Sequence, residues 1–433
     1  MKINSILANR YIPNFRSNMT FDIGGSQREG SCKIYYATTK GDKVIYTQNT
    51  TLNTKGTKTF KDSEDFIDKI VQKVKKVQEI NREHVIEDYT DDENILRSLT
   101  LLVPSYTVGG HAYYLPNHRD TNNRPLKDLD FSTIKTKLKE AGVEIDPRMQ
   151  FRLLQDGMGT GLAMAKKLWE EKLLEKGKYY TACITGGGCG TSNIEMTDNQ
   201  NIIVKSTGSA LLSNPDELLK VSKAGASAPS VIRNFCKVFG FNDELVEDIV
   251  ACHKAEFTLQ EIVKFKEDPN TRRLKQLLLD SGKYELGKEY PATSRDEKEF
   301  ELRPKAEFKE SYERARRHAI DQYCNAFARL ASLKRAEGSN GLIITGPLAK
   351  QINLTATQVY GKSVSEWVKE KTFAKYNQYE IGKMQDHYGF EVYCDDRFFI
   401  DDNTACKKLA HIAQQITPDR GNWVKISIKD LES

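Results

Sequence analysis

Three short glycine-rich segments, each placed directly after an apolar run, constrain this chain more than any other feature. They are Asp22-Ile23-Gly24-Gly25-Ser26, Thr185-Gly186-Gly187-Gly188-Cys189-Gly190-Thr191 and Ile344-Thr345-Gly346-Pro347. Glycines that follow a strand let backbone N–H groups approach phosphate oxygens closely. A carboxylate just before the first turn, Asp22, can hold a magnesium ion directly or through water. One such turn alone is typical of an ordinary β-turn, so it is the set of three that indicates a phosphate site.

A fourth segment, Leu154-Gln155-Asp156-Gly157, places an acid where an apolar run ends and a helical pattern of small residues begins. At the start of a helix, free N–H groups and the positive end of the helix dipole favour the charged carboxylate. Asp156 is therefore a candidate catalytic base. An ordinary N-cap occupies the same position, and the two roles are compatible because a cap fixes the direction of the carboxylate.

The order of apolar runs along the chain predicts an α/β fold, because strands and helices alternate. Strands are expected at 19–23, 31–37, 43–47, 99–103, 151–154, 179–185, 202–205, 341–345 and 390–394. Helices are expected at 62–80, 131–142, 159–169, 312–336, 364–371 and 403–416. The stretch 213–336 is mainly helical in pattern, and its charge-dense part, 264–310, indicates either an insertion or a mobile surface segment.

Length and charge narrow the class of protein. The 433 residues fit two compact domains, and 39% apolar content is enough for two cores. Lys and Arg number 65 against 60 Asp and Glu, a formal net charge of +5. Spread over this length, so small an excess gives little reason to expect nucleic acid or an anionic membrane as the main partner.

The eight cysteines are scattered, and no pair has the CxxC spacing of a zinc ribbon or a redox motif. We therefore expect free, mostly buried thiols in a reducing cytosol. The first residues lack the pattern of a signal peptide, and no apolar run approaches the length of a membrane span. These observations together predict a cytoplasmic protein.

The order and spacing of the segments resemble the sugar kinases of the actin and hexokinase superfamily (ASKHA), most of all the ROK family of bacterial hexose kinases. The resemblance covers most of the chain outside 237–310. Phe21–Ser26 is similar to the first phosphate loop, usually DxGGT, and Ile184–Thr191 is similar to the second, usually GTGxGGG. The resemblance implies Asp22 as the magnesium ligand, Asp156 as the base, and ATP-binding roles for Gly24, Gly25, Ser26, Thr185, Gly186, Gly187, Gly188 and Gly346.

The resemblance also extends to the sugar pocket. Val103–Ser105 and Tyr114–Asn117 are similar to segments that usually read PG and NLPGW, and Glu195–Asp198 falls at the family's ExGH. The implied sugar contacts are Ser105, Asn117, Gln155, Glu195 and Asp198. Alternatives stay open for three of these residues: Asn117 and Asp198 also suit turns, and Glu195 also suits a surface cap or ion pair.

Four departures from the family pattern put the substrate in doubt. Gln155 stands for an Asn and Asp198 for a His, and the second glycine turn, TGGGCGT, is shifted in order. The family's zinc motif would fall near 205–214, where only Gly208 is kept, so no structural zinc is expected.

The resemblance implies two ribonuclease H-like (actin-like) domains that flank a central cleft, with a helical insertion at 237–310 in the second. The expected boundaries are 1–172 with 418–433 for the small domain, and 173–417 for the large one. The implied function is transfer of the γ-phosphoryl group of Mg-ATP to a hydroxyl of a hexose or N-acetylhexosamine. Sugar and ATP would be the partners, without nucleic acid or membrane, and a homodimer would be unsurprising.

Two other functions remain open at this stage. One is a non-catalytic sugar- or nucleotide-binding regulator on the same fold, and the other is a kinase of the superfamily that acts on a polyol or small acid. The retained acids at 22 and 156 favour an enzyme over a regulator. The sugar-pocket similarity favours a sugar over a polyol.

Overall fold

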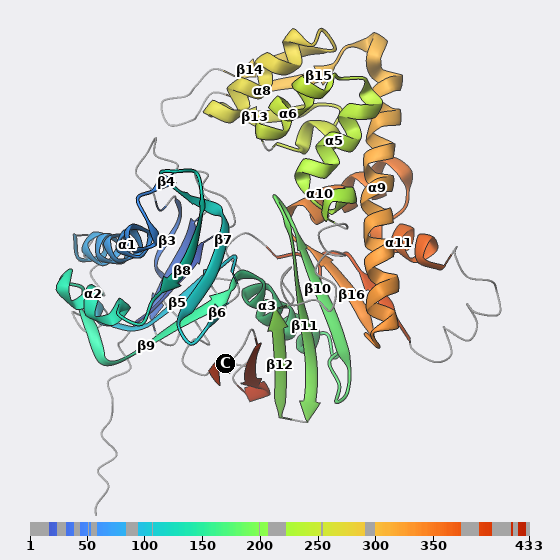
Figure 1. Ribbon diagram of the computed structural model, residues 1–433. Helices are drawn as coiled ribbons and strands as arrows, with labels where there is room; N and C mark the ends of the chain where they lie inside the picture. Colours follow the sequence, from blue (N-terminus) through green and yellow to red (C-terminus); the bar gives the residue numbers. More distant parts are fainter. Residues whose placement is uncertain are drawn as a thin grey trace, which may run out of the picture. The chain divides into compact units, whose positions relative to one another are not determined.

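The computed structural model describes residues 17–23, 32–38, 44–50, 52, 59–83, 94–105, 107–198, 200–206, 222–252, 254–290, 299–373, 389–400, 417–418 and 423–429. By their contacts, these residues separate into two units (Figure 1). One unit comprises the described residues up to Gly159 together with Thr417, Pro418 and Lys429. The other runs from Thr160 to residue 400 and includes Trp423–Ile428.

A mixed five-stranded sheet forms the centre of the first unit, in the order β3-β2-β1-β5-β9. Its strands are β1 (Ser17–Ile23), β2 (Cys32–Thr38), β3 (Val44–Thr50), β5 (Leu96–Val103) and β9 (Ile145–Gln155). β1, β2 and β3 pair antiparallel, whereas β1, β5 and β9 are parallel. All five overlap a run predicted as a strand, and β1, β2 and β5 bury the apolar side chains that made those runs recognisable.

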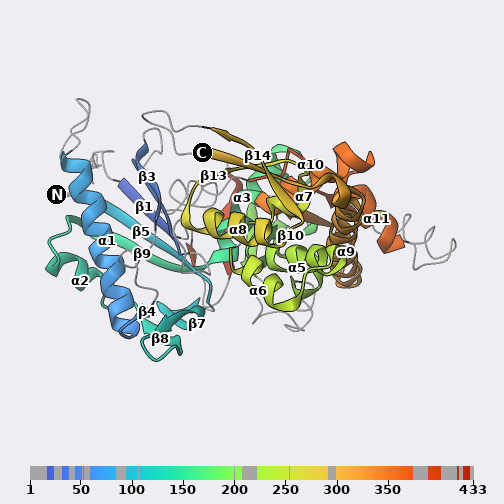
Figure 2. The ribbon, with the colours of Figure 1, turned by 90° about the horizontal axis from the view of Figure 1, so that it is seen from above.

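Helix α1 (Ser63–Glu83) packs its apolar face on this sheet. The buried residues recur at helical spacing, as expected for an amphipathic helix: Phe66, Ile67, Ile70, Val71, Val74 and Val77. The shorter α2 (Ile134–Glu140) lies beside α1 (Figure 2). A small second sheet was not predicted; it contains β4 (Thr59–Phe60), β6 (Thr107–Val108), β7 (His111–Asp120) and β8 (Pro125–Asp130).

A seven-stranded sheet has its central strands in the second unit, and its order is β17-β16-β10-β11-β12-β19-β18. The strands are β10 (Tyr179–Thr185), β11 (Cys189–Asp198), β12 (Asn201–Ser206), β16 (Gly341–Thr345), β17 (Glu391–Tyr393), β18 (Thr417–Pro418) and β19 (Trp423–Ser427). β10, β11 and β12 pair antiparallel, and β10, β16 and β17 are parallel. This pattern repeats the five-stranded arrangement of the first unit.

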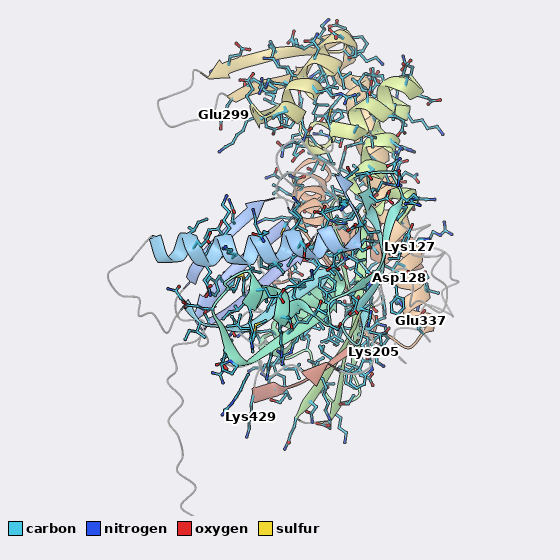
Figure 3. All side chains as sticks on the ribbon, turned by 60° about the vertical axis from the view of Figure 1, so that its left-hand side comes forward. Lys127, Asp128, Lys205, Glu299, Glu337 and Lys429 are labelled. Atoms are coloured by element: carbon cyan, nitrogen blue, oxygen red, sulfur yellow. The ribbon has the colours of Figure 1, made fainter. Side chains whose placement is uncertain are left out.

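Long helix α9 (Lys309–Ala336) is the main support of the second unit's core. It packs against η2 (Ser222–Ala226), α5 (Ala228–Phe239) and α11 (Val364–Phe373). Its last turn buries Lys334, whose ammonium group bonds Glu337 at 2.7 Å just beyond the helix. Figure 3 labels Glu337. A side chain in place of Gly225 would put its Cβ 2.6 Å from the Gln322 carbonyl oxygen, so η2 and α9 can approach this closely only with glycine there.

The insertion predicted as helical at 237–310 also contains a three-stranded antiparallel sheet, so that part of the prediction needs correction. Its elements are α6 (Asp243–Cys252), α7 (Glu256–Leu259), β13 (Val263–Lys266), α8 (Pro269–Asp280), β14 (Tyr284–Tyr290), β15 (Glu299–Pro304) and η3 (Ala306–Phe308). Only alternate strand residues are buried, such as Val263, Phe265 and Phe300. The charges between them form surface ion pairs, among them Lys264 with Glu299 at 2.7 Å. Glu299 is labelled in Figure 3.

The division between the units differs from the predicted boundaries. It falls at Gly159, inside the first turn of α3 (Asp156–Glu170), and not at residue 172. A Cβ at Gly161 would lie 2.4 Å from Val204 Cγ1, so α3 packs closely on β12 and belongs mostly to the second unit. β19 pairs antiparallel with β12, which places Trp423–Ser427 in the second sheet and not, as expected, in the first domain.

Two further expectations concern helices. The helix expected at 403–416 lies outside the described residues. In the part of the chain that the structure covers, every helix is too short or too polar to pass through a membrane.

Candidate active site

Asp156 lies between β9 and α3, at the point where the strand ends and the helix begins. The Gly157 N–H donates to its Oδ1 at 2.7 Å. The residue keeps part of its surface exposed, but burial of the carboxyl, and next the negative charge of Asp22, raise its pKa to about 7. The Gly157 N–H and the charge of Lys33 act in the opposite direction. A carboxyl with this pKa can accept a proton near neutral pH, as a general base must.

Asp22 lies next to the end of β1, directly across from Lys33 on β2. The Lys33 ammonium nitrogen is 3.4 Å from Asp22 Oδ2, and both side chains are largely buried. The sequence analysis missed Lys33. The alternation of residues 31–37 was a usable signal, because it indicates a strand that continues from the first glycine turn.

The first glycine turn itself, Gly24, Gly25 and Ser26, lies outside the described residues. The second glycine turn closes the hairpin of β10 and β11. Gly186 N–H donates to the Gly188 carbonyl at 3.0 Å, and Gly186 accepts from Ala228 N–H at the start of α5, at 2.8 Å. Gly187 and Gly188 are exposed, with open space where a Cβ would point. Their N–H groups are therefore on an accessible, well-anchored turn.

At Gly346, the third glycine turn packs closely on the second. Gly346 precedes α10 (Pro347–Tyr360) with φ 101°, and a Cβ there would lie 2.5 Å from the Thr185 carbonyl oxygen. Thr185 is buried, and its hydroxyl is 3.1 Å from that of Tyr323 on α9. The parallel pairing of β10 and β16 thus places two of the three predicted turns side by side.

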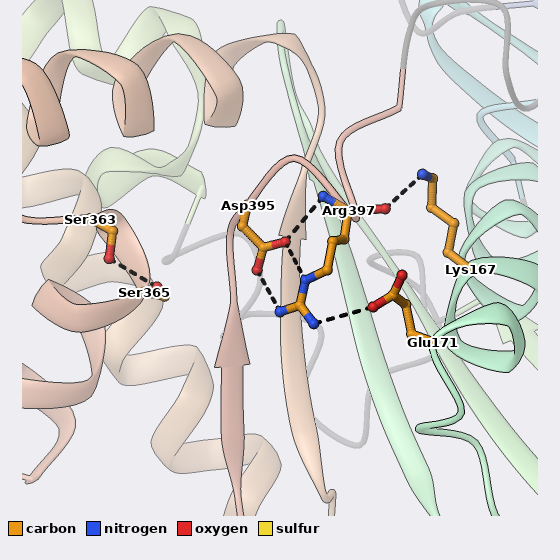
Figure 4. A network of polar contacts seen from close by, with 6 residues as sticks. All are labelled: Lys167, Glu171, Ser363, Ser365, Asp395 and Arg397. Atoms are coloured by element: carbon orange, nitrogen blue, oxygen red, sulfur yellow. Dashed lines mark hydrogen bonds and ion pairs between the residues drawn. The ribbon is translucent and has the colours of Figure 1, made fainter.

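A polar network fixes the loop after β17 to α3 (Figure 4). The Arg397 guanidinium bonds both carboxylate oxygens of Asp395, at 2.9 and 3.0 Å, and reaches Glu171 at 3.3 Å. Lys167 donates to the Arg397 carbonyl at 2.6 Å. The Thr345 hydroxyl donates to the Phe398 carbonyl at 2.8 Å, which ties the same loop to the residue before Gly346.

The predicted sugar contacts have different environments. Ser105 is buried and accepts from the Tyr114 N–H at 3.0 Å. Gln155, next to Asp156, is buried, and its side-chain oxygen finds no hydrogen-bond partner among the described residues. Glu195 is half-buried in the middle of β11, opposite Tyr179. The side chain of Asn117, on β7, lies outside the described set.

Asp198 has the turn environment that the sequence left open for it. Its carboxylate accepts from Gln200 N–H at 2.8 Å and from the Asn201 side-chain amide at 2.9 and 3.0 Å. These bonds, the Gln200 N–H first, hold the pKa of Asp198 below its usual range. The carboxylate therefore stabilises the β11–β12 hairpin.

No group of three or more His, Cys, Asp or Glu side chains suited to a metal ion occurs among the described residues. Most of the region that would correspond to the family's zinc motif is not among them. Magnesium bound with a nucleotide needs only one or two protein carboxylates, because water and phosphates complete its coordination. The largely buried Asp22 meets that requirement.

Comparison with known proteins gives similarity of fold and none of sequence. No family model matches the chain, and no curated protein does. The structure of a glucokinase from Balamuthia mandrillaris in complex with glucose matches with a TM-score of 0.50 and 11% identity, over 91% of this chain and 93% of that one. The structure of a ROK family glucokinase from Streptomyces griseus in complex with glucose and AMPPNP matches with a TM-score of 0.45 and 10% identity, over 92% of this chain and 99% of that one.

A putative sugar kinase from Cytophaga hutchinsonii matches with a TM-score of 0.47 and 10% identity, over 92% of this chain and 99% of that one. A ROK family glucokinase is thus among the solved structures that match this chain. The predicted α/β fold is confirmed, and it is similar to the fold of the Balamuthia mandrillaris glucokinase.

Proposed function

We propose that this protein is an ATP-dependent kinase that phosphorylates a hydroxyl group of a hexose or N-acetylhexosamine. The observation that carries the proposal is Asp156: a carboxyl at a strand end, with its pKa raised to about 7 by burial and by Asp22. Asp156 has a pKa near neutral pH, whereas Asp22 is paired with Lys33. Two acids with such different environments suit two different roles. The fold, shared with a glucokinase, is compatible with this assignment.

The proposed reaction is a single phosphoryl transfer. A sugar hydroxyl attacks the γ-phosphorus of ATP, the bond from that phosphorus to the β–γ bridging oxygen breaks, and ADP leaves. Asp156 accepts the proton of the attacking hydroxyl. Since the transition state is loose, the rest of the catalysis consists of positioning and charge neutralisation.

The exposed glycine turn is suited to the phosphates. The N–H groups of Gly187 and Gly188 would donate to phosphate oxygens, while Thr185 and Gly346 hold the turn from beneath. Asp22 would hold magnesium, which when bound neutralises phosphate charge. Lys33, fixed at 3.4 Å from Asp22, adds a positive charge to the same site.

The buried oxygen of Gln155 supports the choice of a sugar as acceptor. A buried polar atom without a partner is costly, and a ligand hydroxyl would satisfy it. Ser105, on the same unit, and Asn117 and Glu195 complete the proposed contacts. Amide and carboxylate groups that bind a sugar discriminate against analogues that lack a hydroxyl, because these groups are then left unpaired.

One observation favours the second candidate, a non-catalytic sugar- or nucleotide-binding regulator. Asp198, at the position of a sugar-binding histidine in the family, is committed to a hairpin turn. The sugar would then have one contact fewer than in the kinases. Binding without turnover is the outcome that distinguishes this candidate.

The deciding experiment is an acceptor screen. The full chain is incubated with Mg-ATP and a panel of hexoses, N-acetylhexosamines and polyols, and ADP release is measured. We expect turnover with at least one sugar, and a kcat about 10²–10⁴-fold lower for Asp156→Asn with nucleotide affinity nearly unchanged. Asp130→Asn, an exposed carboxylate that accepts from the Ser132 N–H, is the matched control and should keep full activity.

Normal turnover by Asp156→Asn would remove the assignment of the base. Nucleotide binding without any acceptor would favour the regulator, and turnover with polyols alone would exclude a sugar as the substrate.

A further inference from the structure

Two cysteines lie in contact at the base of the second glycine turn. Cys183 pairs with Thr191 and Thr185 pairs with Cys189, so the cysteines are diagonal neighbours across the β10–β11 hairpin. Their sulfur atoms are 3.2 Å apart. Both are free thiols. The pair spans Ile184–Gly188, the segment that contains the glycine turn.

The two thiols have different surroundings. Cys183 is fully buried in the core of the second unit, and burial, then the contact with Cys189, raise its pKa well above the usual range. The charge of Lys334, at the end of α9, acts in the opposite direction on the pKa of Cys183. Cys189 is only half-buried and packs on the edge of the same core. A solution oxidant can therefore reach Cys189 first, while Cys183 stays protected behind it.

We propose that Cys183 and Cys189 form an oxidation site at which a hydroperoxide converts the thiol pair to a disulfide across the base of the glycine turn. The Cys189 thiolate attacks the peroxide, the O–O bond breaks, and water or an alcohol leaves a sulfenic acid on Cys189. The Cys183 sulfur then attacks that sulfur, the S–O bond breaks, and water leaves with the Cys183 proton. The two thiols lose two electrons, and the peroxide gains them.

The contact makes the second step favourable. The buried Cys183 is a poor thiolate, but its sulfur is held 3.2 Å from its partner, and such proximity replaces a bimolecular encounter. A disulfide bond is about 2.05 Å long, so the sulfurs must approach by about 1 Å. The closed loop is short, which limits the entropic gain from the cross-link, and we expect thiols to reduce it readily.

Closure of the pair would move the two strands that support the glycine turn. If that turn binds phosphates, as the proposed function has it, oxidation should weaken nucleotide binding by about tenfold, the effect of losing one hydrogen bond to a charged group. The cross-link itself does not depend on the proposed function. The two statements are therefore tested by separate measurements.

The test uses the full chain, reduced and then treated with stoichiometric hydrogen peroxide. After alkylation of the remaining thiols and proteolysis, mass spectrometry should find Cys183 and Cys189 joined, and dithiothreitol should reverse the link. Cys183→Ser should leave a sulfenic acid on Cys189 that dimedone traps. Cys252→Ser, a buried thiol that donates to the Asp248 carbonyl, is the matched control and should cross-link like the unaltered chain.

Full alkylation of both cysteines after peroxide would overturn the proposal, as would oxidation of Cys189 to a sulfinic acid with Cys183 still free. Circular dichroism of each variant excludes misfolding as the cause. Nucleotide affinity is measured by calorimetry before and after oxidation. If the reduced protein binds no nucleotide, the proposed function fails while the cross-link result stands.

Discussion

The two units use the same strand order and place different chemistry at the strand ends. β3-β2-β1-β5-β9 in the first corresponds to β12-β11-β10-β16-β17 in the second. The first strand leads to Asp22 in one unit and to Thr185 and a glycine turn in the other. After the fifth strand, each unit has an aspartate: Asp156 after β9 and Asp395 after β17.

These two aspartates differ in their partners. Asp156 has a raised pKa, next to another acid, whereas Asp395 is bound by Arg397 through both oxygens. Position in the fold thus does not decide what a carboxylate can do. Its burial and the charge of its neighbours do. The comparison can be tested by substituting each of the two aspartates.

The largest expected effect is the difference in kcat between variants of these two aspartates. Asp156→Asn should lower kcat by about 10²–10⁴-fold, because the general base is lost. Asp395→Asn should leave kcat within about twofold, because its contacts with Arg397 are structural and partly exposed. Steady-state ADP release with the best acceptor measures both. Equal losses in the two variants would show that the strand-end position matters and not the environment.

The next largest effect is on stability, and it tests the close packing of the third glycine turn on the second. Gly346→Ala should lower the free energy of unfolding by about 2–5 kcal/mol, since it forces a Cβ to 2.5 Å from Thr185 O at φ 101°. Gly361→Ala, at the other end of α10, has a positive φ but open space around it. It should cost only about 1–2 kcal/mol, the penalty of a left-handed backbone conformation for an L-residue. Urea titrations of both variants would measure the difference, and similar losses would contradict the close packing.

The dependence of kcat/KM on pH gives a third test. Activity requires deprotonated Asp156, so kcat/KM should rise with pH and reach half its maximum near pH 7. Lys33→Met removes a positive charge that lowers the pKa of Asp156, so the midpoint should move to higher pH. Rates measured from pH 5 to 9 with a fixed acceptor would detect the shift. A midpoint near pH 4 in the unaltered protein would mean that the carboxyl is not tuned as described.

The same raised pKa makes stability depend on pH. Folded Asp156 holds its proton up to about pH 7, whereas an unfolded Asp releases it near pH 4. Its contribution to stability is therefore fully present below about pH 4 and is lost as the pH rises to about 7. The slope is at most about 1.4 kcal/mol per pH unit. Asp156→Asn should flatten the slope of the unfolding free energy against pH. An unchanged slope would mean that another titrating group causes it.

The smallest effect concerns the network after β17. Arg397→Gln should lower the free energy of unfolding by at most about 1 kcal/mol, because half of the Arg397 side chain is exposed to water. Thermal unfolding in low and high salt would measure it, and the loss should shrink in high salt. A loss of several kcal/mol would make this loop a main support of the second unit.

Sequence patterns predicted the parts of the fold that are locally encoded. The central strands and α1 follow from apolar runs whose side chains are buried. β7 escaped prediction because Tyr113 and Tyr114 are both exposed, at 48% and 45%, which hides any alternation. β19 escaped because its partner, β12, lies far away in the sequence.

The candidate site was predictable to the same degree. Asp22 could be found because it comes just before a glycine turn, and Asp156 because it follows an apolar strand. Lys33 and Arg397 could not be assigned because their importance depends on which strands and helices pair. The catalytic and sugar-binding roles stay predictions.

The pairing of β12 with β19 has a consequence for synthesis on the ribosome. All strands of the first central sheet are made by residue 155, so that sheet can form while the rest of the chain is still being translated. β12 ends at Ser206, and its partner begins only at Trp423. Until then, β12 presents an open edge that can pair with another nascent chain. Chaperone binding during elongation would protect this edge.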